Sequence, residues 1–88
     1  MKGGGSYKLL FTFSEAAKLL NIPKEILYNF VVDNKLCYYR NYSDEPISYA
    51  KYAGKDSLFV IRKNEKGRKK SLLTEFGLKY FAKQDYNI

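Results

Sequence analysis

A run of cations in the second half of the chain has the residue types that bind phosphate. The nine residues from 62 to 70 hold six cations and one acid, Glu65, so their net charge is +5. Lysine and arginine neutralise the phosphates of nucleic acid and release counterions, which gives an affinity that falls with salt and ignores base sequence. The candidates for contact with a phosphate backbone are Arg62, Lys63, Lys66, Arg68, Lys69 and Lys70. A solvated hairpin without a ligand is the alternative.

A second polar set lies on the helix expected from 23 to 33. If its apolar residues Ile26, Leu27, Phe30 and Val31 face the core, the opposite face shows Lys24, Glu25, Tyr28, Asn29 and Val32. Asparagine pairs well with adenine and lysine with guanine in the major groove. The candidates for reading DNA bases are therefore Lys24, Tyr28 and Asn29. A plain exposed helix face is the alternative.

The residues that enzymes and metal sites need are scarce. The chain has one cysteine, Cys37, and no histidine, so a zinc site cannot be assembled from them and no nearby base activates the thiol. Cys37 is expected to be a half-buried small hydrophobic residue. The acids Asp33, Asp44, Glu45 and Asp56 are scattered, and no glycine-rich phosphate loop is present. The sequence therefore predicts neither an enzyme nor a cofactor or metal site.

The segment from 14 to 31 has the spacing of a helix-turn-helix. Ala17 is small where the second helix must approach closely, and Asn21 tolerates the left-handed backbone of the turn. The apolar positions that pack the second helix onto the first are Ile22, Leu27 and Phe30. An ordinary helical hairpin with the same apolar pattern is the alternative.

The first half is expected to begin with a short edge strand or lead-in segment at 9–13. Ser14 is the expected N-cap of the first helix, at 15–20, with Phe13 packed against its first turn. Pro23 suits the first turn of the second helix because its missing N–H is not needed there.

The second half predicts a hairpin and a closing helix. The expected elements are a strand at 36–40, a loop through 48, strands at 58–63 and 70–73 around a turn at 64–67, and a helix at 75–83 capped by Thr74. The segment 49–53 is ambiguous. The predicted fold is α+β, a small winged helix-turn-helix with a β-hairpin wing and a closing C-terminal helix. In such a module the second helix enters the major groove and the wing reaches the phosphates or the neighbouring minor groove.

Composition agrees with one small basic domain. The chain has 88 residues, 45% hydrophobic and 28% charged, and a net charge of +7. A basic balance favours polyanionic partners. We expect a flexible linker or expression remnant at 1–8 and one domain at 9–88. Without a long apolar run or signal pattern, the protein is expected to be intracellular, with no membrane partner, and the sequon Asn41-Tyr42-Ser43 is expected to arise by chance.

An ordered set of motifs resembles the C-terminal domain of phage antirepressors, the KilA C-terminal or KilAC domain. The motifs are F-x-x-S-E-A-A-K-L-L-N-I at 11–22, L-C-Y-Y-R at 36–40, P-I-x-Y-x-x-Y at 46–52, L-F-V at 58–60 and L-T-E-F-G-L-K-Y-F at 73–81. Asn21 stands where the family usually has glycine, Glu75 where it often has proline, and the glycine before the strand is displaced to Gly54. Short helix-turns of excisionases and MerR-type regulators are also similar, but they do not account for the closing T-x-x-G helix.

The resemblance implies a regulator of transcription in a phage or prophage, acting in the cytoplasm or nucleoid of a bacterial host. Such regulators help to switch lysogeny to lytic growth. The domain would bind double-stranded DNA or engage another regulator.

A protein-interaction or oligomerisation module that binds a repressor or another regulator is the alternative function. Tyrosine is enriched at interfaces, and the tyrosines available for such a surface are Tyr38, Tyr39, Tyr42, Tyr49 and Tyr52. The same rings can stack on single-stranded bases. Most of them are expected to fill the small core or its rim.

Overall fold

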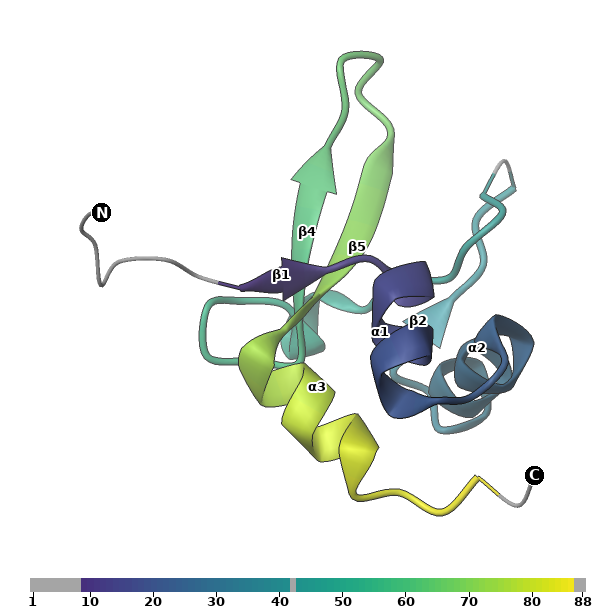
Figure 1. Cartoon of the computed structure of the whole chain (residues 1–88). Coiled ribbons are helices and arrows are strands. Elements are labelled where there is room, and N and C mark those ends of the chain that lie inside the picture. The colour runs from purple at the N-terminus through teal and green to yellow at the C-terminus, as the bar shows by residue number, and fades with distance from the viewer. Residues whose placement is uncertain (1–8, 42, 87–88) are drawn as a thin grey trace.

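The structure, a computed structural model, describes residues 9–41 and 43–86. The expected linker at 1–8, and Tyr42 with the sequon around it, lie outside the described residues. The described part contains three α-helices, a three-stranded antiparallel sheet and a separate two-stranded hairpin (Figure 1). The α+β class predicted from the sequence is therefore confirmed.

Helix α1, Phe13–Leu20, begins two residues earlier than predicted, because Thr12 is its N-cap. The Oγ1 atom of Thr12 accepts a hydrogen bond from the Glu15 N–H at 3.1 Å, and Glu15 Oε1 accepts one from the Thr12 N–H at 2.8 Å. This reciprocal pair is a capping box. The prediction of Ser14 as the cap is wrong: Ser14 is exposed inside the helix, and Phe13 is a fully buried residue of its first turn.

The turn after α1 is the one predicted from Asn21. Asn21 adopts a left-handed backbone with φ 59° and ψ 45°, and the Ile22 N–H donates to the Ala17 carbonyl at 3.0 Å. Helix α2, Lys24–Asp33, follows, with Pro23 as its N-cap. A proline suits this end because its missing N–H would have no helical partner.

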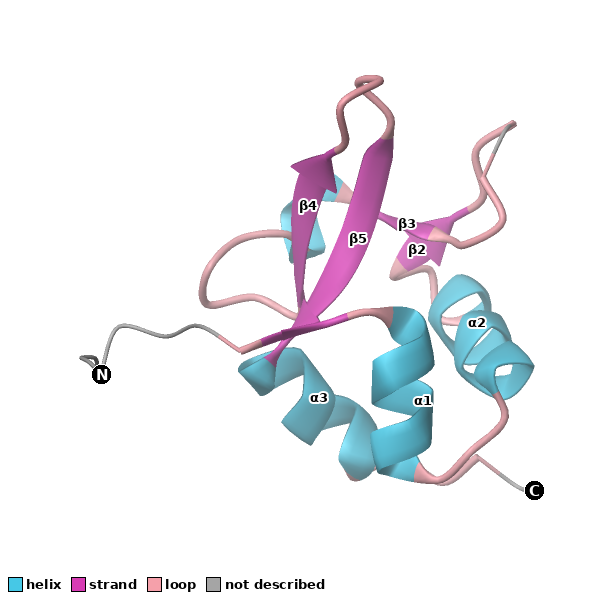
Figure 2. Ribbon diagram, turned by 45° about the horizontal axis from the view of Figure 1, so that its top comes forward, coloured by secondary structure: helices cyan, strands magenta, loops and turns pink. Residues whose placement is uncertain are grey.

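The sheet has the strand order β1-β5-β4. Strand β1, Leu10–Phe11, is an edge strand, the first of the two alternatives for 9–13, and it pairs with β5, Lys69–Thr74. Strand β4, Phe59–Lys63, pairs with β5 from Phe59 opposite Leu73 to Lys63 opposite Lys69. The far half of this β4–β5 hairpin extends beyond the body of the fold in both ribbon views (Figures 1 and 2).

The second hairpin is only partly anticipated by the sequence. Strand β2, Cys37–Tyr38, pairs with β3, Ile47–Ser48, so the prediction of a loop through Ser48 is wrong at its end. The Ser48 N–H donates to Ser71 Oγ at 2.7 Å in a buried contact, which fixes β3 against β5. The ambiguous segment that follows contains a short 3₁₀-helix, η2, Ala50–Tyr52.

Helix α3, Glu75–Ala82, is held against the sheet by the residues at its start. Thr74 caps it as predicted: its Oγ1 accepts from the Gly77 N–H at 2.9 Å and donates to the Ser57 carbonyl at 2.5 Å. A Cβ atom at Gly77 would lie 2.1 Å from the carbonyl oxygen of Leu58. Only glycine allows this close approach, so Thr74 and Gly77 together position α3.

The core fills the space between the helices and one face of the sheet. The Phe59 ring lies 6.0 Å from the Phe13 ring and 5.8 Å from the Phe81 ring, measured between centroids. Cys37 is 2% exposed, so it is more deeply buried than predicted. Ala17, Leu27 and Val31 are buried as expected, which packs α2 against α1.

Candidate nucleic-acid interface

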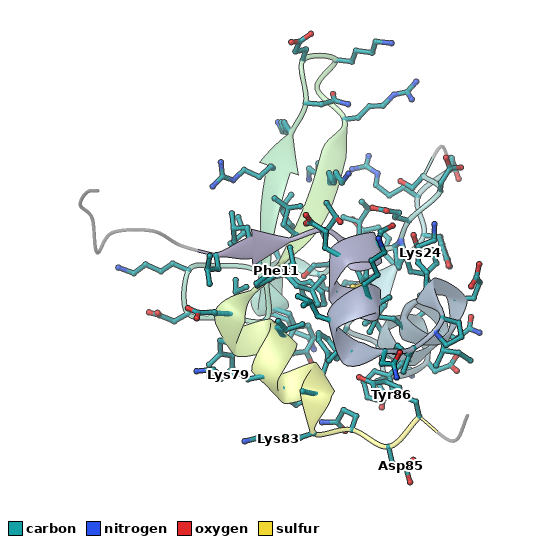
Figure 3. The ribbon with its side chains drawn as sticks, in the orientation of Figure 1. Phe11, Lys24, Lys79, Lys83, Asp85 and Tyr86 are labelled. Carbon is teal, nitrogen blue, oxygen red and sulfur yellow. The ribbon has the colours of Figure 1, made fainter. Side chains whose placement is uncertain are left out.

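The β4–β5 hairpin carries cations on both of its faces and at its tip. Arg62 is paired with Lys70, and Lys63 with Lys69. Because side chains alternate along a strand, the first pair lies on one face of the hairpin and the second on the other. All six cations predicted to contact phosphate are exposed here, and Figure 3 shows nitrogen-tipped side chains along the whole hairpin.

The tip of this hairpin has a defined shape. Asn64 Oδ1 accepts hydrogen bonds from the N–H groups of Lys66 at 2.9 Å and Arg68 at 3.0 Å. The Asn64 N–H donates to the Arg68 carbonyl at 2.9 Å, and Gly67 has a φ of 77°. A left-handed backbone at this position suits glycine. These contacts hold the backbone of Arg68 at both its N–H and its carbonyl.

Two of the three predicted base-reading residues are exposed, and the third is buried. Lys24 and Asn29 lie on the surface of α2. Tyr28 is only 9% exposed, its ring packs edge-on against Phe13 at 5.4 Å, and its hydroxyl donates to Glu45 Oε2 at 3.2 Å. The prediction that Tyr28 lies on an exposed face is wrong, because α2 is covered on one side by α1 and on another by the loop that contains Glu45.

The environment of Tyr28 keeps its hydroxyl protonated. Burial, and then the charge and hydrogen bond of Glu45, raise the pKa of Tyr28 well above its usual range. Tyr28 therefore acts as a neutral donor that ties α2 to the loop between β2 and β3. Val32, also predicted to be on the exposed face, packs partly against the core.

The charge on α2 is not positive. Its exposed surface carries Lys24 with two acids, Glu25 and Asp33, and the amide of Asn29. The excess of positive charge therefore lies on the hairpin and not on α2.

One cation beside the hairpin was not among the candidates. Arg40 follows β2 and lines a cleft together with residues at the hairpin tip, including Arg68 and Lys69. The sequence shows Arg40 as the last residue of an expected strand. The sequence does not show that Arg40 lies beside a turn nearly thirty positions later in the chain. Arg40 could therefore not be predicted as part of this site.

The loop between β2 and β3 connects the surface of α2 with the hairpin. Lys24 Nζ lies 5.9 Å from the centre of the Tyr28 ring, and Tyr28 bonds to Glu45. Glu45 in turn lines a hollow with Arg68, Lys69 and Lys70 of the hairpin. The first turn of α2 is thus linked through Tyr28 and Glu45 to the β2–β3 loop, and this loop adjoins the hairpin tip.

The tyrosine surface considered as an alternative is partly formed. Tyr39 and Tyr49 are 50% and 41% exposed, and the Tyr49 ring lies 4.8 Å from that of Tyr38. Tyr52 packs partly against the core. Tyr42 lies outside the described residues.

The remaining features to consider are the Cys37 thiol, the side chains that could hold a metal ion, and helices that could cross a membrane. Burial raises the pKa of the Cys37 thiol to about 12, so the thiol is neutral at physiological pH. Within residues 9–41 and 43–86, no three cysteine, aspartate or glutamate side chains gather where they could hold a metal ion. In the same residues, no helix has the length and apolar character needed to cross a membrane.

Comparisons with models of known protein families, with curated proteins and with solved structures found no match to this chain. Its own residues and their arrangement are therefore the basis for assigning a function.

Proposed function

We propose that this chain is the double-stranded DNA-binding domain of a phage or prophage antirepressor or a similar transcription regulator. The proposed architecture is a winged helix-turn-helix, with α2 in the major groove and the β4–β5 hairpin, the wing, on the phosphate backbone. The observation that carries the proposal is the wing itself, an extended hairpin with six exposed cations and one acid. Such a surface neutralises phosphates whatever the base sequence.

The order of the elements supports this architecture. Two helices joined at the left-handed Asn21 are followed by an extended hairpin and a closing helix. The β2–β3 loop contacts α2 through Tyr28 and Glu45 and adjoins the wing tip, which supports a model in which a single duplex contacts both α2 and the wing. In this arrangement the wing supplies most of the affinity, and Lys24 and Asn29 are the remaining candidates for base reading.

The salt dependence of DNA binding tests the proposal. Fluorescence anisotropy with a labelled duplex, at several salt concentrations, compares the wild type with Arg68→Ala/Lys69→Ala/Lys70→Ala. We expect weak binding whose slope of log affinity against log salt falls by about two to three in the variant, since each phosphate contact contributes about 0.9. In the same titration, Asn29→Ala should reduce the preference between duplex sequences more than the affinity for any one of them.

A triple variant that removes equal charge elsewhere is the control. Lys55→Ala/Lys79→Ala/Lys83→Ala removes three exposed cations, and Figure 3 shows Lys79 on α3 and Lys83 at its C-terminal end, away from the wing tip. Its salt slope should stay close to that of the wild type. Wild-type protein that does not bind duplex at low salt, or equal losses in the two triple variants, would contradict the proposal.

A second candidate function is self-association, favoured by a groove beside the sheet that is lined by both apolar and charged side chains. Leu9 and Phe76 are 51% and 60% exposed and line a groove of about 720 Å³ with Leu10 and Val60. Exposed apolar patches of this kind mark contact surfaces. The charged residues at its rim, two of each sign, are Lys55, Lys79, Asp56 and Glu75. A dimer in sedimentation experiments, without duplex binding at low salt, would favour this function over the first.

A further inference from the structure

A basic cleft lies between the β2–β3 loop and the tip of the wing. Both loops rise from the same side of the body in the two ribbon views (Figures 1 and 2). The cleft has a volume of about 220 Å³ and is lined by Arg40, Asn41, Ser43, Gly67, Arg68 and Lys69. We propose that this cleft is a clamp for one phosphate group of a nucleic-acid backbone. The inference rests on the proposed function for the source of the phosphate, and it adds a second loop to the contact surface.

The chemistry of the lining fits a phosphate. Its described residues include three cations and no acid, and Asn41 and Ser43 add side-chain donors. An arginine on each wall, Arg40 and Arg68, can present two parallel N–H groups to phosphate oxygens. Because both arginines are exposed, they remain hydrated until a ligand enters.

Both walls of the cleft have hydrogen bonds that fix their backbones. On the wing, Asn64 holds the N–H and the carbonyl of Arg68. On the other wall, the Ser43 N–H donates to the Arg40 carbonyl at 3.1 Å. Apart from its two chain neighbours, no residue has an atom within 4 Å of the place where a Cβ of Gly67 would be, so the wing tip is open at Gly67.

Acidic residues next to the cleft define where the anion sits. Asp44 and Glu45 line the neighbouring hollow, of about 350 Å³, together with Arg68 and Lys69. Their carboxylates repel a phosphate from that hollow. An anion between the two loops is therefore most stable on the Arg40 side, where the lining is wholly cationic or neutral.

A double-mutant cycle on the full chain tests the clamp. Anisotropy at low salt gives the affinity for a labelled duplex of the wild type, Arg40→Ala, Arg68→Ala and the double variant. Each single change should lower the affinity about tenfold, as expected for a charged hydrogen-bonded contact. The double variant should lose much less than the roughly hundredfold of independent contacts, because both arginines hold the same phosphate.

Two further variants separate geometry from charge. Arg40→Lys keeps the charge but loses the two-pronged donor, so its affinity should lie between those of the wild type and Arg40→Ala. Lys55→Ala, which removes an exposed cation outside the cleft, should change the affinity by less than about twofold. Wild-type affinity in Arg40→Ala, or losses that multiply fully in the double variant, would overturn the clamp while duplex binding by the wild type leaves the proposed function in place.

Inorganic phosphate distinguishes a free anion from a backbone phosphate. Its titration at constant ionic strength is followed through the amide NMR signals of Gly67 and Arg68 in the wild type and in Arg40→Ala. Non-additive losses of duplex affinity in the double-mutant cycle, together with only weak NMR shifts on adding inorganic phosphate, would identify the nucleic-acid backbone as the ligand. Tight, saturable shifts that vanish in Arg40→Ala, in a wild type that does not bind duplex, would overturn both the nucleic-acid ligand and the proposed function.

Discussion

At the scale of single residues, two hydroxyl side chains two positions apart have different roles. Thr12 caps α1 through its bond from the Glu15 N–H, whereas Ser14 is exposed within the first turn. Both are common capping residues, and both stand before an apolar helical run. The deciding feature is Glu15, which lies three positions after Thr12 and so completes a capping box with it.

This assignment predicts opposite outcomes for two similar substitutions. Thr12→Ala should lower the free energy of unfolding by about 1 kcal/mol, because it removes the cap. Ser14→Ala should change it by less than about 0.5 kcal/mol, since alanine is a better helix former at an exposed position. Urea unfolding followed by circular dichroism measures both. A larger loss in Ser14→Ala than in Thr12→Ala would contradict the assignment.

The roles of some residues could be predicted from the residue and its neighbours in sequence, whereas the roles of others depend on tertiary contacts. Asn21 and Thr74 were predicted because a left-handed turn and a helix cap depend on the residue's own side chain and its near neighbours. Tyr28 and Arg40 were misjudged or missed because their surroundings come from a loop and a hairpin distant in sequence. Helical periodicity predicts one buried face of a helix. Helix α2 is also covered on a second face, where Tyr28 contacts the β2–β3 loop.

At the scale of elements, the wing keeps like charges directly opposite each other. Arg62 faces Lys70 and Lys63 faces Lys69, and like charges in opposed positions destabilise a pair of strands. The hairpin is nevertheless held by its tip, where Asn64 accepts two backbone hydrogen bonds, and by its base, where Phe59 faces Leu73 in the core. A hairpin that is fixed at its tip and base but carries opposed cations between them would be stabilised by a bound anion.

Reversing one charge of a pair should separate stability from binding. Lys63→Glu places an acid opposite Lys69 and should raise the free energy of unfolding by about 0.2 to 1 kcal/mol. The same change should weaken duplex binding, since it removes one cation of the wing and adds an acid. Urea unfolding and anisotropy measure the two effects.

Lys55→Glu is the matched control for this reversal. It makes the same change in net charge at an exposed position outside the wing, so it should weaken duplex binding less and have no cross-strand gain in stability. A lower free energy of unfolding in Lys63→Glu than in the wild type would show that repulsion between Lys63 and Lys69 does not destabilise the hairpin.

The elements themselves were predictable to different degrees. The β4–β5 hairpin and α3 follow from β-branched residues, a glycine turn and a threonine cap, which are strong local signals. The β2–β3 pair consists of two-residue strands separated by a polar loop, too short for alternation to be visible. Its position depends on the buried bond from the Ser48 N–H to Ser71, which joins segments more than twenty residues apart.

At the scale of the whole molecule, the deep burial of Cys37 links the stability of the fold to pH. The folded protein raises the pKa of this thiol from 9.0 to about 12 through burial. Between these values the folded chain keeps the thiol proton and the unfolded chain loses it. The contribution of Cys37 to the free energy of unfolding is therefore fully present well below pH 9. It is lost as the pH rises from 9 toward 12, because the unfolded state then binds fewer protons than the folded state.

The size of this fall can be predicted in a narrow window. The contribution of Cys37 to the free energy of unfolding should drop by about 1 kcal/mol between pH 9 and pH 10, close to the limit of about 1.4 kcal/mol for one group over one pH unit. Tyr86, whose pKa rises from 10.0 to about 12 through burial and the nearby Tyr80, adds its contribution mainly above pH 10. Tyr28, with its pKa also raised, does the same. From pH 9 to pH 10 each of these tyrosines contributes a further fall of about 0.4 kcal/mol, so Cys37 is the largest single contributor in this interval.

The variant Cys37→Ala isolates this contribution. It lowers stability at every pH because it leaves a small cavity, but it removes the ionisable thiol, so its free energy of unfolding should fall less than that of the wild type from pH 9 to pH 10. Urea unfolding at both pH values gives the two differences. Equal falls in the two proteins would contradict the prediction, because they would show that burial of this side chain, 2% exposed, does not raise the pKa of its thiol.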